Sequence, residues 1–365
     1  MCAAEFDNIF VAKNATVFPF RKYEIIHGRR VWSHGVETRE EITELALNLH
    51  RYGKSVINST LRTKSALPEH ERLCGTWLYG GILFNHFGHF FAESIHRLWA
   101  WNQVKKNSQG VVFLSPSGAS KAWLREYMHD ALEFYKVPAS SIKIVKDIVE
   151  VDQLYLPLPG SGIGMKQPSW YRQYLLPSNV VGQSINSRKV FISRRNFLFS
   201  GKVAGLSYLE KMFENRGFEI VFPETLSFHE QLIRLRDARV IVWEESSNIH
   251  LLDLLSPIEA KTYLIKRRPK WSLFEGILRE KSNFMGLFDR IKKLPVSNEN
   301  SKLLQSDISR KSLLQCIDHR QLFEFSNKIL TEIGHNKIDC FDEFRKGICT
   351  QERVDIEAFE KGPVA

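Results

Sequence analysis

The fold class of this 365-residue chain can be read from residues 218–243, FEIVFPETLSFHEQLIRLRDARVIVW. An apolar run of strand length (Phe218–Val221) precedes an amphipathic stretch of helical length (Phe228–Asp237), and a second apolar run (Val240–Trp243) follows it. Short apolar strands that alternate with helices are typical of parallel sheets that are covered on both faces. The stretch therefore predicts a β-α-β unit of an α/β domain.

The same alternation continues on both sides of this unit. Upstream lie a predicted strand at 189–194 (KVFISR) and a helix at 207–215, and downstream lie a helix at 248–255 and a strand at 262–265. Such a series is typical of a doubly wound domain, which binds ligands beyond the carboxyl ends of its strands. We assign residues 171–270 to a nucleotide-binding domain of this kind.

The rest of the chain shows weaker patterns. Expected strands lie at 9–12, 16–20, 110–115, 142–146 and 153–158, and expected helices at 37–51, 85–101, 119–135 and 321–332. A segment rich in glycine and proline, 157–177, includes a GSGIG run that no helix promptly follows, and we interpret this run as a hinge or interdomain loop. We assign residues 1–170 to an N-terminal domain, and expect 271–365 to be an extension that packs back on it.

The composition predicts a globular chain with an anionic partner. Hydrophobic residues make up 43% of the sequence, no long uncharged apolar run occurs, and Glu5 and Asp7 lie where a secretory signal would be basic and then apolar. The five scattered cysteines suggest reduced thiols and a cytoplasmic protein. The net charge of +10 favours nucleic acid, an anionic membrane surface or a phosphorylated small molecule.

A first candidate site is the expected helix NHFGHFFAESIHRLWAW at 85–101. One helical stripe would carry His86, His89, Glu93, His96 and Arg97. His89 and Glu93, one turn apart, are candidates for a base and its orienting carboxylate. Alternatively, Glu93 and Arg97 form a surface ion pair and the histidines are structural. A zinc site built from His86, His89, Glu93 and His96 matches no compact zinc motif, so we expect no metal.

Two loops in the second domain are candidate ligand sites, because each follows a predicted strand. Arg194 and Arg195, directly after KVFIS, could clamp a pyrophosphate, although a solvated basic loop is the commoner role of such a pair. Glu244 could accept hydrogen bonds from ribose hydroxyls, while Ser247 or Asn248 caps the next helix and presents backbone N–H groups to an anion. The sequence has no GxSxG elbow, no phosphate-binding P-loop and no zinc-finger consensus.

Together these segments resemble glycosyltransferase family 61, over roughly residues 75–260. Four blocks carry the resemblance, in the family's order: Asn85, Gly88, His89, Glu93 and Arg97-Leu98, with His96 in place of the usual proline; Ser193 and Arg194 in FISRRN; Gly217, Phe218, Pro223, Glu224, Ser227, Phe228, Glu230 and Gln231; and Glu244, Ser247 and His250 in WEESSNIHL. In the last block Trp243 and Ser246 replace glycines, and Leu251 replaces an asparagine.

The resemblance implies an α/β, GT-B-like architecture, in which two Rossmann-like doubly wound domains face each other across a cleft. It also implies an inverting, metal-independent transfer from a nucleotide-sugar donor to a glycan or lipid-linked glycan acceptor, as in bacterial surface polysaccharide biosynthesis, without a cofactor. His89 and Glu93 would then be catalytic. Arg194 and Arg195 would bind the donor diphosphate, Glu244 the ribose, and Ser247 and His250 the phosphates.

Two other functions remain open at this stage. The charge, and aromatic residues beside basic ones at 170–172 and 266–271, are compatible with a nucleic-acid-binding protein, although the basic residues are dispersed. The replacements at Trp243, Ser246 and Leu251 are compatible with a catalytically degenerate scaffold. In the transferase reading, which includes no nucleic acid, the charge would favour peripheral contact with an anionic inner membrane.

Overall fold

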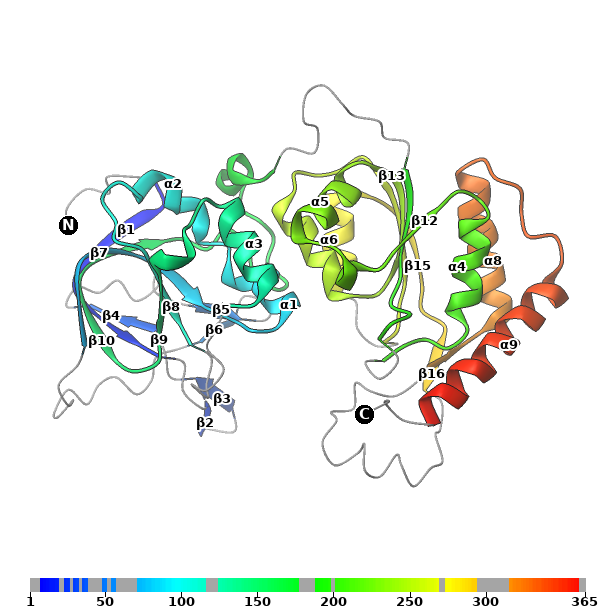
Figure 1. The fold of residues 1–365 in the computed structure, drawn as a ribbon, viewed down its shortest axis with the longest axis horizontal. Coiled ribbons are helices and arrows are strands. Elements are labelled where there is room, and N and C mark those ends of the chain that lie inside the picture. Colours follow the sequence, from blue (N-terminus) through cyan, green and yellow to red (C-terminus); the bar gives the residue numbers. More distant parts are fainter. Residues whose placement is uncertain are drawn as a thin grey trace. The chain divides into compact units, whose positions relative to one another are not determined.

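The computed structural model describes residues 7–19, 23–26, 29–32, 35–38, 48–50, 54–56, 71–115, 124–176, 188–197, 201–268, 273–293 and 315–360. The chain divides into two compact units, Met1–Leu176 and Pro177–Ala365, both drawn in Figure 1. We predicted a boundary after residue 170, and the contacts divide the chain after Leu176.

The first unit is built on a six-stranded mixed sheet. In order across the sheet, its strands are β4 (Gly35–Glu37), β1 (Ile9–Phe18), β10 (Val149–Pro157), β7 (Glu71–Ile82), β8 (Val111–Leu114) and β9 (Ile142–Val145). The last four run parallel, whereas β1 is antiparallel to β10 and β4 is antiparallel to β1. Residues 146–148 alone join β9 to β10. This link is too short for a helical crossover, so the unit departs from the expected doubly wound domain.

The helices of the first unit are short. They are α1 (Phe87–His89), a π-helix (Phe90–Ser94), α2 (Trp101–Val104), α3 (Glu126–Phe134) and 3₁₀ turns at Leu98–Ala100, Ala139–Ser141 and Ser169–Tyr174. Two small hairpins pair β2 (Tyr23–Ile26) with β3 (Arg29–Trp32) and β5 (Asn48–His50) with β6 (Lys54–Val56). The expected continuous helix over 85–101 is therefore wrong, because a π-turn and a 3₁₀ turn interrupt it.

Several other predictions for this unit can be compared with the structure. The strands at 110–115, 142–146 and 153–158 are confirmed, and so is the part of the helix at 119–135 that lies at Glu126–Phe134. The strands expected at 9–12 and 16–20 are one strand, β1, which continues through Asn14 at a φ of 48°. The helix expected at 37–51 is wrong at both ends, where the chain is in strands, and 39–47 lie outside the described residues.

The central strand of the first unit, β7, was not predicted, because its sequence, ERLCGTWLYGGI, contains three glycines. At Gly80 the structure supplies the reason: a Cβ atom there would lie 2.5 Å from the ring of Phe113 on the neighbouring strand β8. A residue that looks like a strand breaker is thus required by close packing inside the sheet.

The second unit is the doubly wound domain that the sequence predicts. Its five strands all run parallel, in the order β12 (Glu219–Val221), β11 (Arg188–Ile192), β13 (Ala238–Glu244), β14 (Lys261–Ile265) and β15 (Asn283–Phe288). The connecting helices are α4 (Leu206–Glu214), α5 (Phe228–Arg236), a 3₁₀ helix (Ser247–Leu254) and α6 (Leu273–Lys281). At the start of α5, the Ser227 hydroxyl accepts from the Glu230 N–H and the Glu230 carboxylate accepts from the Ser227 N–H, a capping box.

Residues 271–365, which we expected to form a separate extension, contribute to the second unit. Strand β15 extends the sheet. Helices α8 (His319–Glu332) and α9 (Phe341–Glu360) add Leu322, Ile329, Phe344 and Ile348 to the core shared with α4 and the strands. Figure 1 shows α4, α8 and α9 on one side of the sheet and α5 and α6 on the other. The predicted helix at 321–332 is confirmed, and packing of this segment on residues 1–170 stays a prediction.

A small hairpin of β16 (Ile291–Lys293) and β17 (Gln315–Ile317) precedes α8. Among the described residues, no helix combines the length and the apolar composition that a membrane span requires.

Candidate functional site

The strand order of the second unit brings two of the predicted loops together. Numbered along the chain, the order is 2-1-3-4-5, and it reverses between β11 and β13. Doubly wound sheets bind ligands beyond the carboxyl ends of the strands at such a reversal. The loops after β11 and β13 begin here, at Ser193 and Glu245, and the loop after β14 begins beside them, at Lys266.

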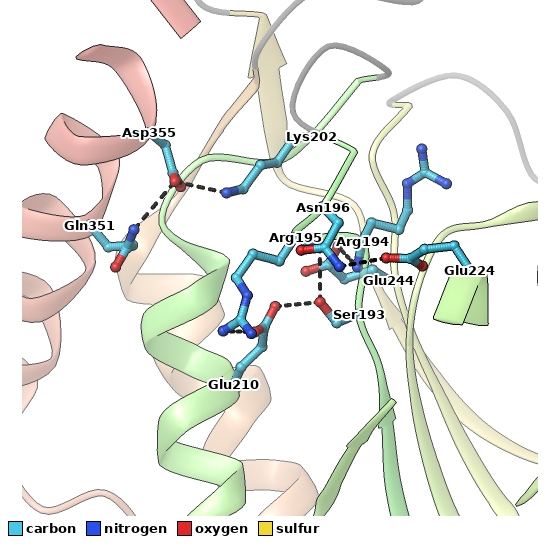
Figure 2. A network of polar contacts seen from close by, with 10 residues as sticks. All are labelled: Ser193, Arg194, Arg195, Asn196, Lys202, Glu210, Glu224, Glu244, Gln351 and Asp355. Carbon is cyan, nitrogen blue, oxygen red and sulfur yellow. Dashed lines mark hydrogen bonds and ion pairs between the residues drawn. The ribbon is translucent and has the colours of Figure 1, made fainter. Parts of the chain in front are cut away.

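The loop after β11 is held by a buried carboxylate on α4. Ser193 donates a hydrogen bond of 2.6 Å to Glu210, and the Ser193 hydroxyl accepts one of 3.0 Å from the backbone of Arg195. The Arg195 guanidinium lies 3.1 Å from the second oxygen of the same Glu210. Asn196 donates to Glu224 at 2.7 Å. Figure 2 shows this network, in which the positive charge of Arg195 is already balanced by the protein.

Arg194 and Glu244 are joined at the reversal point itself. The Arg194 backbone N–H donates to Glu244 Oε2 at 2.8 Å. Burial, together with the negative charge of Glu210, raises the pKa of Glu244 to about 8, although the nearby Arg194 lowers it. In Figure 2 the Arg194 side chain points away from the Ser193–Glu210 pair, whereas the Arg195 side chain points toward it. The side chains of the two neighbouring arginines therefore point in different directions.

Two further arginines lie at this edge, after β14. Glu245, only 2% exposed, accepts from the backbone N–H groups of Arg267 (2.9 Å) and Arg268 (3.2 Å) and is 2.6 Å from the Arg268 guanidinium. Burial and the positive charges of Arg194 and Arg268 lower the pKa of Arg267 to about 9. We call Arg194, Arg267 and Arg268 the arginine cluster. The three guanidiniums lie within electrostatic reach of one another, and although Glu245 pairs with Arg268, their combined positive charge favours an anion at this edge.

Arg267 and Arg268 were missed as site residues. In the sequence they belong to the basic and aromatic stretch 266–271, which we interpreted only as compatible with nucleic-acid binding. Their position was a usable signal, because they follow the predicted strand at 262–265 directly and so lie at the ligand-binding edge of the sheet.

The loop after β13 enters a 3₁₀ helix that begins at Ser247. The Ser246 hydroxyl is buried and has no hydrogen-bond partner within the described part of the chain, whereas Ser247 is half-buried. Asn248 accepts from the Trp243 indole at 3.4 Å and donates to Gln231 at 2.6 Å. Asn248 is thus structural, and the serines offer hydroxyls beside the arginine cluster.

His250 is not brought to the surface with the arginines. Its side chain is 2% exposed, its Nδ1 lies 3.2 Å from Asp253, and its ring packs edge-on against Phe274. The Arg268 guanidinium lies over the Phe274 ring, 5.9 Å from its centroid. The structure thus places His250 behind Phe274 and Arg268.

In the first unit, His89 and Glu93 form the pair that the sequence predicts. His89 Nδ1 is 2.8 Å from Glu93 Oε2, and the side chains are 23% and 3% exposed. A carboxylate can only accept, so Nδ1 carries a hydrogen and a neutral ring keeps its lone pair on Nε2. The pair follows the carboxyl end of β7 and spans the start of the π-helix, an element that is frequent at functional sites.

Of the other residues of the predicted polar stripe, His86 lies beside His89, with ring centroids 5.4 Å apart, but the prediction is wrong for His96 and Arg97. His96 and Arg97 are buried: the His96 ring nitrogens contact the Tyr171 hydroxyl and the Phe91 carbonyl, and Arg97 donates to the Pro157 carbonyl. The cause is the irregular helix, whose turns rotate these side chains into the core. Both His96 nitrogens are thus engaged in contacts within the first unit.

The glycine-rich run after β10 is also buried. Gly160 donates its N–H to the His96 carbonyl at 2.9 Å, and a Cβ at Gly160 would lie 2.1 Å from the Tyr171 ring. Residues 160–163 are buried inside the first unit. The interpretation of this run as a hinge or interdomain loop is therefore wrong, and the run instead packs beside the segment that carries His89.

A family model described as Glycosyltransferase 61 matches residues 87–269. The chain belongs to glycosyltransferase family 61. The match begins at α1, just before His89, and ends just after Arg268, so it spans the site residues of both units. Membership implies a transferase that uses a sugar donor and a glycan acceptor. No curated protein sequence matches the chain significantly.

Proposed function

We propose that this family 61 protein is an inverting glycosyltransferase that binds a nucleotide-sugar at the arginine cluster and transfers its sugar to a hydroxyl of a glycan. The observation that carries the proposal is the position of Arg194 at the strand-order reversal of a doubly wound sheet, with Arg267 close to it at the end of the adjoining strand β14. Guanidiniums at this edge match the charge and the planar oxygen geometry of a diphosphate.

The residues of the proposed donor site have different roles. Arg194, Arg267 and Arg268 neutralise the diphosphate, and the buried Ser246 hydroxyl and the half-buried Ser247 hydroxyl donate to its oxygens. Glu244 and Glu245 hold the arginine loops through backbone N–H groups. The Arg195 side chain points toward Glu210, whereas that of Arg194 points away from it (Figure 2), so we expect Arg195 to contribute less to diphosphate binding than Arg194. The expected ribose contact of Glu244 stays a prediction, and His250 supports Arg268 through Phe274.

His89 is the base in this proposal and Glu93 orients it. The acceptor hydroxyl oxygen attacks the anomeric carbon from the face opposite the diphosphate, and a new C–O bond forms as the bond to the phosphate oxygen breaks. His89 Nε2 takes the hydroxyl proton, and Glu93 stabilises the imidazolium that results. The leaving diphosphate keeps the bonding electron pair, and its charge is balanced by the arginine cluster without a metal.

This chemistry requires the two units to meet in a GT-B arrangement, which is part of the proposal. The acceptor hydroxyl at His89 and the donor sugar at the arginine cluster must share one reaction space. We further propose a lipid-linked acceptor in surface polysaccharide synthesis, reached by docking of the basic protein on an anionic membrane. Equal sedimentation with neutral and anionic vesicles would remove the docking proposal.

The donor site is tested by calorimetric titration of nucleoside diphosphates into the wild type and into Arg267→Ala. Removal of one charged contact to the diphosphate should weaken binding by about 10- to 100-fold, since hydrogen bonds to charged groups contribute about 1.5–3 kcal/mol. Arg239→Ala is the matched control, because Arg239 is exposed near the amino end of β13, away from the carboxyl edge. Equal affinities in all three proteins would refute the assignment.

The base is tested by separating donor binding from turnover. His89→Ala should lower kcat by about 100- to 10,000-fold, which is the usual contribution of a general base, and leave the affinity for the nucleotide unchanged. His129→Ala replaces an exposed histidine of the same unit and should leave both values unchanged. Full turnover in His89→Ala would remove His89 from the mechanism.

The rival functions give different outcomes in the same experiments. A catalytically degenerate scaffold would bind no nucleotide-sugar. A nucleic-acid-binding protein would bind DNA or RNA with a steep salt dependence. The arginines favour a compact anion, because carboxylates such as Glu245 hold them in fixed loops at one edge of the sheet.

A further inference from the structure

A second group of ligand-type side chains lies in the second unit, where β17, α8 and α9 come together. His319 is the first residue of α8, and Cys349 and Glu352 lie one turn apart on α9. His319 Nε2 is 2.9 Å from Glu352 Oε1, and His319 Nδ1 is 3.8 Å from Cys349 Sγ. One donor atom from each of the three residues lies within 4.8 Å of the other two.

A fourth residue of ligand type is near in sequence. Cys316 on β17 precedes His319, the first residue of α8, by three residues. The chain thus supplies two pairs with one spacing, Cys316-x-x-His319 and Cys349-x-x-Glu352, which is the short spacing typical of zinc ligands.

We propose that His319, Cys349 and Glu352 bind a zinc ion through donor atoms that lie within 4.8 Å of one another. Thiolate, imidazole and carboxylate are the three ligand types that zinc accepts, and thiolates disfavour magnesium and calcium. With Cys316, three residues before His319, as a fourth ligand, the ion would be tetrahedral and have no position for substrate, so the site would be structural. Zinc binds cysteine as the thiolate, so loading of the site should release protons.

The position of the proposed site in the fold indicates which contact a bound ion would stabilise. One turn beyond Glu352 on α9, Asp355 accepts from the buried Lys202 at 2.8 Å and from the Gly205 N–H at 2.9 Å. A Cβ at Gly205 would lie 2.9 Å from Glu352 Cγ, so α9 packs closely against the start of α4. An ion that ties α9 to β17 and α8 would fix this contact. The proposal does not depend on the sugar-transfer function.

The test is a cobalt titration of the full-length, chelator-treated and reduced protein, because cobalt reports tetrahedral thiolate ligation by its absorption. We expect one equivalent to bind, with a thiolate-to-cobalt charge-transfer band, and zinc to displace it. His319→Ala and Cys349→Ser should each weaken cobalt binding more than about 100-fold, since even outer-shell changes cost 10- to 100-fold. Cys340→Ser, which replaces an exposed cysteine just before α9, should bind as the wild type does.

Three results would overturn the proposal as a whole: no stoichiometric cobalt binding by the wild type, binding without a charge-transfer band, or unchanged binding in both His319→Ala and Cys349→Ser. Glu352→Gln, which keeps the size of the side chain, guards against a folding artefact and should also weaken binding. A Cys316→Ser spectrum identical to that of the wild type would refute the four-ligand assignment.

Discussion

Glu244→Gln distinguishes a neutral from an ionised carboxyl group at the candidate donor site. Glutamine keeps the shape of the side chain and an oxygen that can accept the 2.8 Å hydrogen bond from the Arg194 N–H. It resembles the protonated form of the acid and cannot ionise. Since burial raises the pKa of Glu244 to about 8, the folded wild type holds a proton at neutral pH that the unfolded chain has released.

The sign and the size of the effect follow from this difference. The stabilisation from the bound proton is fully present below the unfolded pKa, near 4.5, and is lost as the pH rises through about 8. At about 1.4 kcal/mol per pH unit, a rise from pH 5 to pH 8 should cost the wild type about 4 kcal/mol more than Glu244→Gln. Burial also raises the pKa of the neighbouring Glu210, so the titration belongs to both carboxyl groups.

Urea unfolding of the two proteins at pH 5, 6, 7 and 8, followed by circular dichroism, measures this difference. We expect the stability of the wild type relative to Glu244→Gln to fall steadily across the series. Glu259→Gln, at an exposed position of the same unit, should track the wild type at every pH. If the free energies of unfolding of Glu244→Gln and the wild type change in parallel with pH, or if that of Glu244→Gln falls more steeply as the pH rises, then Glu244 is ionised in the folded protein.

Three further substitutions have expected effects on the free energy of unfolding. Trp243→Ala removes a fully buried indole and should cost about 3–5 kcal/mol; a loss below 1 kcal/mol in urea unfolding would contradict the packing. Asp355→Ala leaves the buried Lys202 ammonium without its carboxylate and should cost about 3–5 kcal/mol, and Lys202→Met in the same chain should recover part of it. Gly160→Ala places a Cβ 2.1 Å from the Tyr171 ring and should cost about 1–3 kcal/mol, whereas an unchanged Tm would contradict the close approach.

The second unit could be predicted closely from the sequence, because its strands are short apolar runs separated by helices of ordinary length. The capping box at Ser227 and the apolar run before Glu244 are local signals that the tertiary structure leaves intact. The predicted site loops also follow from this regularity, since parallel strands put their carboxyl ends at one edge.

The first unit could not be predicted to the same extent, and its errors have physical causes. Strand β7 contains Gly80, which only the packing of Phe113 explains, and glycines read as breaks in a single sequence. A π-turn shifts the helical register after Glu93, so His96 faces the core instead of sharing a stripe with His89. The spacing of apolar and polar residues in the sequence does not predict a π-turn.

The site could be predicted in part. The pairing of His89 with Glu93 was predicted correctly, because residues four apart lie next to each other within one helical turn. Arg267 could have been included because it follows a predicted strand, but its proximity to Arg194, which lies far away in sequence, could not be predicted. Contacts of this kind depend on the strand order, and periodicity alone does not give that order.

The first measurement to make is the thermal unfolding of the purified protein with a panel of UDP-, GDP-, CMP- and dTDP-sugars. A ligand that binds only the folded state raises its stability by about 2.7 kcal/mol at a concentration of 100 times Kd. We expect one nucleotide class to raise the Tm, and Arg194→Ala to abolish the increase while Arg239→Ala retains it. No increase with any nucleotide-sugar, or the same increase in Arg194→Ala, would contradict a donor site at the arginine cluster.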